Sequence, residues 1–159
     1  MIVRQARVAD AAAIAALINP VVRDTSITFT TEEKNPESLA QAIDAPGSSY
    51  HVVELHGQVV GYACYFPFRN GPGYAHTKEH SIVLAPEARG HGAGRALMAA
   101  LEAHARGAGV HSLFAGVSGE NPAGVAFHAS IGFQEIGRLP QVGRKFDRWM
   151  DLILMQKFL

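Results

Sequence analysis

The first third of the chain changes from an alternating pattern to a helical one. Residues 1–6, MIVRQA, alternate apolar and polar side chains, which predicts a β-strand. The alanine-rich segment after Asp10 repeats its apolar positions at helical spacing, and Asp10 is the expected N-cap of this helix. Pro36 occupies a first-turn position and predicts a second, shorter helix over residues 36–45.

Three β-rich segments follow this helical region. Residues 49–57 and 58–68 predict two strands joined by a turn at Gly57, and therefore a hairpin. Residues 76–84 predict a further strand, which Pro86 ends.

The remaining part of the chain alternates between helices and strands. The pattern predicts a helix, a strand, a helix and two strands over residues 92–106, 111–117, 121–131, 133–142 and 150–158. The whole order is β-α-α-β-β-β-α-β-α-β-β. This order predicts an α/β protein with a mixed sheet around one core.

Composition narrows the classes of function that need to be considered. The chain of 159 residues is expected to form a single domain, residues 1–159. Its formal net charge is zero, which argues against nucleic acid or an anionic membrane as a partner. We expect neither a signal peptide, because charged residues interrupt the apolar positions at the start, nor a membrane span, because no apolar run approaches the required length. The single cysteine, Cys64, excludes an internal disulfide, so we expect a cytoplasmic protein.

The segment RGHGAG places glycines directly before a predicted helix. It is no Walker A loop, because no Gly-Lys-Ser/Thr follows, and it lacks the third small residue of a dinucleotide fingerprint. Arg89, Gly92 and Gly94 do fit the pattern Arg/Gln-x-x-Gly-x-Gly/Ala between a strand and a helix. Main-chain N–H groups, the helix dipole and Arg95 then favour a pyrophosphate. The alternative is a glycine-rich helix start with solvated arginines.

Two motifs resemble one enzyme superfamily. RGHGAG resembles the acetyl-CoA pyrophosphate loop of the GNAT acetyltransferases, and ENPAGVAFHASIGF resembles their second signature. Together with VGRKFDRWMDLILMQ, the chain is similar over nearly its whole length to the phosphinothricin N-acetyltransferase subfamily, which includes enzymes acting on methionine sulfone and sulfoximine. The resemblance implies the GNAT fold, with a mixed, mostly antiparallel central sheet and about four helices on its faces.

Acetyl transfer to an amine requires a base, oxyanion stabilisation and protonation of the departing thiolate. The resemblance implies that Glu79 is the general base, acting directly or through water; the alternative is an edge-strand carboxylate in solvent. His128 stands where many members carry the tyrosine that protonates the thiolate, and a helix histidine packed on the core is its alternative. His80, next to Glu79, should point to the opposite face of its strand.

The resemblance also implies acetyl-CoA (coenzyme A) as the cofactor. The main chain of Ile82, Val83 and Leu84 is expected to pair with the pantetheine arm and to supply an oxyanion N–H. Asn121 is expected to bond the pantetheine amides or to cap its own helix, and Ser130 to touch the cofactor or to lie on the surface. The expected pyrophosphate loop consists of Arg89, Gly90, His91, Gly92, Ala93, Gly94 and Arg95.

An acceptor pocket follows from the same resemblance. Its expected lining consists of Phe29, Arg69, Asn70, Gly71, Glu79, His80 and Ser81. Arg69 is a candidate partner for the carboxylate of an amino acid, or else a solvated loop residue. Lys145, Phe146 and Trp149 are expected near the same cleft, although a tryptophan is more often a core residue.

Three positions depart from the subfamily pattern. Gly71 and Val83 replace an arginine and a tyrosine that relatives often carry, and Lys78 partly restores the lost charge.

Cys64 is expected to be a small core residue without a histidine partner, so direct transfer in a ternary complex is favoured over a covalent intermediate. No metal site is predicted, because His76 and His80 lack a third ligand in the sequence.

These observations predict an N-acetyltransferase that uses acetyl-CoA. The expected acceptor is the α-amino group of a small amino-acid analogue such as phosphinothricin, methionine sulfone or methionine sulfoximine. Another amine (a polyamine, an aminoglycoside or a protein N-terminus) and a non-catalytic acyl-CoA sensor are the alternatives. The resemblance also implies a homodimer, with which the apolar segment LILM is compatible.

Overall fold

The computed structural model describes all 159 residues as two compact units, each assembled from separate segments of the chain. The first unit comprises Met1–Asn19, Glu33–Tyr65 and Ser81–Gly109. The second unit comprises Pro20–Glu32, Phe66–His80 and Val110–Leu159. The expectation of a single domain over residues 1–159 stays a prediction.

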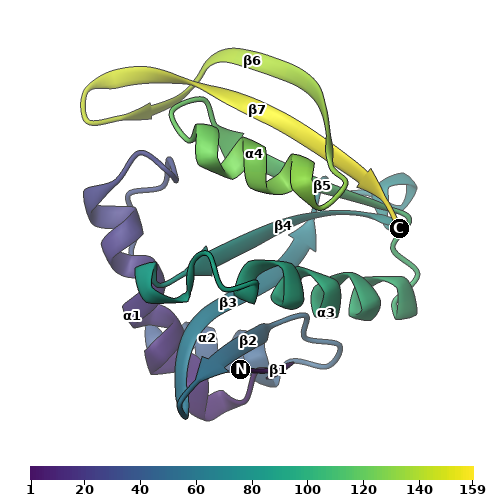
Figure 1. The fold of residues 1–159 in the computed structure, drawn as a ribbon. Helices are drawn as coiled ribbons and strands as arrows, with labels where there is room; N and C mark the ends of the chain where they lie inside the picture. Colours follow the sequence, from purple (N-terminus) through teal and green to yellow (C-terminus); the bar gives the residue numbers. More distant parts are fainter. The chain divides into compact units, whose positions relative to one another are not determined.

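The order of helices and strands is the one that the sequence predicts (Figure 1). The elements are β1 (Ile2–Gln5), α1 (Ala11–Asp24), α2 (Pro36–Asp44), β2 (His51–Leu55), β3 (Gln58–Pro67), β4 (Thr77–Leu84), α3 (Ala93–Gly107), β5 (Ser112–Ser118), α4 (Pro122–Ser130), β6 (Gln134–Lys145) and β7 (Arg148–Phe158). Three short 3-10 helices, η1 (Val8–Asp10), η2 (Pro72–Tyr74) and η3 (Pro86–Ala88), lie in the connections.

The strands form a mixed sheet of seven members in the order β1-β2-β3-β4-β5-β7-β6. Pairing is antiparallel between β1 and β2, β2 and β3, β5 and β7, and β6 and β7, whereas β4 and β5 run parallel. Strand β4 passes through both units, with residues 77–80 in the second and residues 81–84 in the first. The predicted fold class is confirmed.

The first unit is built around the β2–β3 hairpin and helix α3. The hairpin turns at His56 and Gly57, whose φ values of 51° and 79° are those of a tight two-residue turn. Helix α3 packs on β1 and β2, and Leu97 and Leu101 on its inner side are fully buried. Cys64 on β3 is a free, buried core residue as expected, and burial raises the pKa of its thiol to about 11.

Asp10 does not cap helix α1, contrary to the sequence-based prediction. It ends η1, and its carboxylate accepts hydrogen bonds from the Arg7 amide at 2.7 Å and from Arg4 Nη1 at 2.7 Å. Arg4 also pairs with Glu54 on β2, so one guanidinium joins β1, η1 and β2. The hydrogen bond with Arg4 lowers the pKa of Asp10 and outweighs the opposing effect of burial.

The second unit is a sheet covered by helix α4. Helix α4 packs on β5, β6 and β7. The core of the second unit includes Leu113, Phe133 and Met155. The β6–β7 hairpin is longer than predicted, because Phe146 and Asp147 form a tight turn with φ values of 53° and 57° (Figure 1). Such a turn normally contains glycine or asparagine, so the sequence gives little sign that pairing continues up to it.

No helix of the structure combines the length and the apolar character that crossing a membrane requires.

Candidate active site

Glu79 lies half-buried on β4, in the second unit. Its register partner on the parallel strand β5 is Phe114, and Gly116 follows two residues later on the same face. A Cβ atom at Gly116 would come within 2.8 Å of Glu79 Oε1. Gly116 therefore leaves the space that the Glu79 carboxylate occupies.

The environment of Glu79 suits a proton acceptor. Burial raises the pKa of its carboxyl group above the ordinary value. A carboxylate with a raised pKa is a stronger base than one in free solution and is still ionised at neutral pH when the shift is moderate. The solvated edge-strand alternative does not describe this half-buried residue.

An aromatic group extends from Glu79 toward the segment that was expected to bind the acceptor. Phe68 stacks on Phe114 with ring centroids 4.5 Å apart. The guanidinium carbon of Arg69 lies 5.9 Å from the centroid of the Phe68 ring. Arg69, Asn70 and Gly71 form an exposed turn, in which Gly71 adopts a φ of 105° and precedes η2. Within the second unit these contacts link Arg69 to the surroundings of Glu79.

His80 and His128 form a buried pair. Their Nε2 atoms are 3.1 Å apart, and both rings contact Phe133. His128 Nδ1 lies 2.7 Å from the carbonyl oxygen of Gly124. Because a carbonyl oxygen only accepts, neutral His128 carries its proton on Nδ1, and its Nε2 accepts from the Nε2–H group of His80.

Burial sets the charge of this pair. Desolvation lowers the pKa of His128, partly offset by the hydrogen bond to Gly124. His128 is therefore predominantly neutral at neutral pH. His80 points away from the Glu79 face, as predicted, and the structure places it against His128. Sequence reasoning missed this pair, because nothing local relates two residues separated by 48 positions.

The aromatic ring of Phe29 packs against β6. A Cβ atom at Gly143 would come within 2.4 Å of the Phe29 ring, so this ring covers Gly143. Lys145, two residues further on, is only 4% exposed. Phe146 and Trp149 are 51% and 57% exposed, and the interpretation of Trp149 as a core residue is wrong. Trp149 instead stacks against the guanidinium of Arg144, at 5.1 Å.

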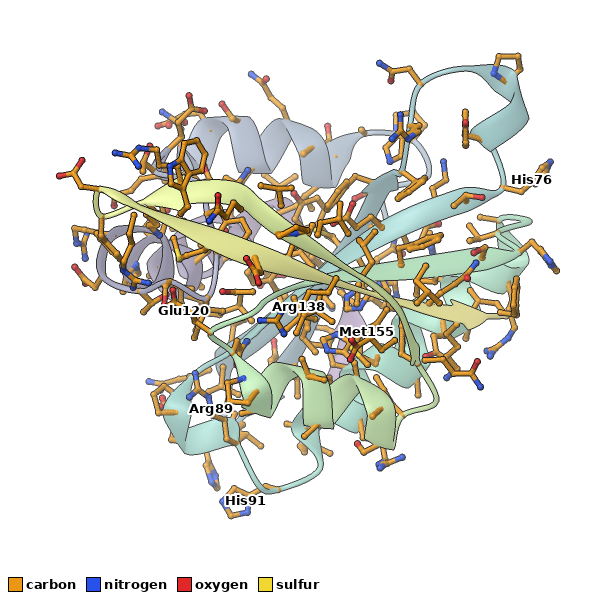
Figure 2. The ribbon with its side chains drawn as sticks, turned by 90° about the horizontal axis from the view of Figure 1, so that it is seen from above. His76, Arg89, His91, Glu120, Arg138 and Met155 are labelled. Carbon is orange, nitrogen blue, oxygen red and sulfur yellow. The ribbon has the colours of Figure 1, made fainter.

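The glycine-rich loop belongs to the first unit and leads into helix α3. Gly90 and Gly92 adopt φ values of 77° and 78°, which only glycine adopts readily. Gly92 is the N-cap of α3 and has no capping side chain, and open space surrounds the Cβ positions of both glycines. Figure 2 shows Arg89 and His91 on this loop, and Arg89 Nη2 donates to the Leu84 carbonyl oxygen at 3.3 Å. Exposed amides at a helix N-terminus beside Arg89 fit a diphosphate.

The other residues expected to contact the cofactor lie on β4 and at the two ends of α4. Ile82, Val83 and Leu84 lie half-buried on β4, in the first unit together with Ser81. Asn121 caps α4, because its Oδ1 accepts from the Gly124 amide at 3.0 Å. The Ser130 hydroxyl donates to the Phe127 carbonyl oxygen at 2.7 Å. Their roles toward a cofactor stay predictions.

Comparison with known proteins identifies the class. Residues 19–133 match the acetyltransferase (GNAT) family, and the chain belongs to this family. It is 39% identical to the L-amino acid N-acyltransferase MnaT of Escherichia coli K12, over 98% of this chain and 92% of the relative. It is 37% identical to the L-methionine sulfoximine/L-methionine sulfone acetyltransferase of Salmonella typhimurium LT2, over 98% of this chain and 93% of the relative.

A solved structure extends the comparison to the fold. The phosphinothricin acetyltransferase of Sinorhizobium meliloti, solved in complex with acetyl-CoA, matches with a TM-score of 0.90 and 31% identity, over 99% of this chain and 88% of that one. The family, the acetyltransferase class and acetyl-CoA as the family's cofactor, all predicted from the sequence, are confirmed.

The close contact at Gly116 generates a prediction. Gly116→Ala places a methyl group where Glu79 Oε1 now lies, so the carboxylate must move. If Glu79 is the general base that the sequence predicts, a displacement of about 1 Å can cost roughly 100-fold, so we expect kcat to fall by about tenfold to 100-fold. Free-thiol release from acetyl-CoA measures the rate. Gly137→Ala on β6 is the control, since nothing lies within 4 Å of its Cβ position. Equal rates in both variants would contradict a base at this position.

Proposed function

We propose that this acetyltransferase transfers the acetyl group of acetyl-CoA to the α-amino group of a small amino-acid analogue. The observation that carries the proposal is Glu79, a half-buried carboxylate with a raised pKa in space left by Gly116. Methionine sulfone, methionine sulfoximine and phosphinothricin are the proposed acceptors. The names of the relatives from Escherichia, Salmonella and Sinorhizobium support this class.

The first unit holds the donor. Acetyl-CoA supplies an activated thioester. The amides of Gly90 to Gly94 and the N-terminus of α3 bind its diphosphate, and Arg89 and Arg95 add positive charge. The main chain of Ile82 to Leu84 pairs with the pantetheine arm, and one of its N–H groups stabilises the oxyanion.

The second unit holds the base and the acceptor. Glu79 removes one proton from the ammonium group, so that the neutral amine attacks the thioester carbonyl directly in a ternary complex. Arg69 binds the carboxylate of the acceptor, and its contact with Phe68 directs it toward the Phe114 side of the site.

The histidine pair supplies the proton that the departing thiolate requires. His128 alone is a poor acid, since its own N–H group is bound to the Gly124 carbonyl oxygen. One N–H group lies between the two Nε2 atoms of His80 and His128. The pair acts as an acid in the minor form that has taken up a second proton from solvent, because burial keeps the predominant form neutral. The ammonium group loses two protons, one to Glu79 before the attack and one after the C–N bond has formed. The sulfur gains one proton as the C–S bond breaks, so the overall reaction releases one proton to solvent.

An acceptor panel tests the substrate class. We expect free-thiol release with L-methionine sulfone, L-methionine sulfoximine and L-phosphinothricin, and none with spermidine or kanamycin. The reason is that one carboxylate-binding arginine and a small aromatic wall suit a zwitterion rather than a polycation. Activity with spermidine or kanamycin alone would replace the acceptor class. Acetyl-CoA binding without turnover on any amine would favour a sensor.

Glu79→Gln tests the base. We expect kcat/KM for the acceptor to fall by about 100-fold or more, because the amide cannot accept the proton. The dissociation constant of acetyl-CoA, measured by calorimetry, should stay unchanged. In the unsubstituted enzyme kcat/KM should rise with pH through the raised pKa of Glu79, since only the ionised form is active. Glu135→Gln, at an exposed position of β6, is the matched control. Unaltered turnover in Glu79→Gln would eliminate Glu79 as the base.

We also propose a cytoplasmic homodimer. The β6–β7 hairpin exposes Ile136, Val142, Phe146 and Trp149, a set of apolar side chains suited to a second copy. The free thiol of Cys64 suits a reducing compartment. Light scattering at micromolar concentration should give twice the chain mass of 17.0 kDa, and a mass of one chain would refute the dimer.

A further inference from the structure

The segment that carries Phe29 has no regular structure of its own. Residues 25–35 connect α1 to α2 without a helix or strand, and Phe29 is the residue of this segment that is proposed to line the acceptor pocket. A segment without its own hydrogen-bond ladder takes its position from the contacts that it makes. The position of Phe29 therefore depends on what holds residues 25–29.

Lys145 holds this segment by its main chain. It ends β6, and its Nζ donates to the carbonyl oxygens of Thr25 at 2.6 Å and Thr28 at 2.8 Å. Two main-chain carbonyl oxygens thus accept hydrogen bonds from its ammonium group. Burial lowers the pKa of Lys145, and the charge of Asp24 partly opposes this shift. A buried charge is costly unless it is hydrogen-bonded, so this lysine requires the segment to stay in place.

Gly143 holds the same segment through the Phe29 ring. It lies two residues before Lys145, and alternation along a strand puts both positions on one face of β6. The ring lies so close that a Cβ atom at Gly143 would come within 2.4 to 2.6 Å of three ring atoms. The absence of a side chain at Gly143 therefore allows the Phe29 ring to pack directly against the main chain of β6.

Glu120 provides a third contact from the connection between β5 and α4. Its carboxylate accepts hydrogen bonds from the hydroxyl of Ser26 and from the guanidinium of Arg148 on β7 (Glu120 is labelled in Figure 2). The main chain, one hydroxyl and one ring of residues 25–29 are thus each fixed to the strand scaffold of the second unit.

We infer that Lys145 and Gly143 are positioning residues, which dock residues 25–29 on β6 and so set the wall that Phe29 presents to the acceptor. The inference rests on the proposed function for the role of Phe29 and on the contacts above for the docking. Neither residue touches the reacting atoms. Their effect falls on the fit of the acceptor, and the donor is bound by residues of the first unit.

The first test removes the ammonium group and keeps an unbranched side chain that reaches the ε position. Lys145→Met should raise the KM for L-methionine sulfone by about tenfold or more, as expected when a pocket wall moves, with the KM for acetyl-CoA unchanged. Lys157→Met is the matched control, because Lys157 Nζ donates to the Ile131 carbonyl oxygen at 2.7 Å elsewhere in the second unit. Equal acceptor KM values in the two variants would overturn the inference.

A double-mutant cycle tests the contact between Gly143 and the Phe29 ring. As a single substitution, Gly143→Ala should lower kcat/KM for the acceptor. Added to Phe29→Ala, it should have little further effect, because the ring that the new methyl group would displace is already absent. Additive losses would overturn the role of Gly143. The cycle also keeps the inference testable if Lys145→Met does not fold.

Hydrogen exchange separates this inference from the proposed function. Without any substrate, amides of residues 25–31 should exchange faster in Lys145→Met than in Lys157→Met, as measured by mass spectrometry. Unchanged exchange would overturn the docking, whatever the activity. If the unsubstituted enzyme acetylates none of the three proposed acceptors, the proposed function fails, and the exchange rates still decide whether Lys145 docks the segment.

Discussion

The parallel pairing of β4 with β5 is the constraint on which the surroundings of Glu79 and His80 depend. Thr77 to His80 lie beside Ser112 to Ala115, so the position of every side chain on this part of β4 is fixed. Because neighbouring residues of a strand point to opposite faces, Glu79 is directed toward Phe114 and Gly116, and His80 toward His128. A slip of one residue would exchange the two groups and remove both environments at once.

Burial then gives these groups their chemical character. The same physical cause raises the pKa of Glu79 and lowers the pKa of His128, because removal of water disfavours the charged form of each group. The shift at Glu79 strengthens this carboxylate as a proton acceptor, whereas the shift at His128 keeps the histidine predominantly uncharged at neutral pH.

The second unit combines this fixed scaffold with an irregular segment. Strand pairing places Glu79, but residues 25–29 depend on Lys145, Gly143 and Glu120 for their position. The position of Glu79 and the position of Phe29 therefore rest on different interactions. A substitution in residues 25–29 can therefore alter the surface that Phe29 presents without altering β4, the strand that carries Glu79.

Local patterns in the sequence were sufficient for the elements, the glycine-rich loop, the helix cap at Asn121 and the family, because periodicity, φ preference and short motifs act within a few residues. The same patterns failed for the predicted helix cap at Asp10, whose carboxylate pairs with Arg4. They also failed for the interpretation of Trp149 as a core residue, because its ring is exposed and stacks against Arg144. The histidine pair, the space at Gly116 and the buried ammonium of Lys145 arise from residues 37 to 120 positions apart. Only the tertiary structure decides such contacts, because strand register and packing, rather than local propensity, bring these residues together.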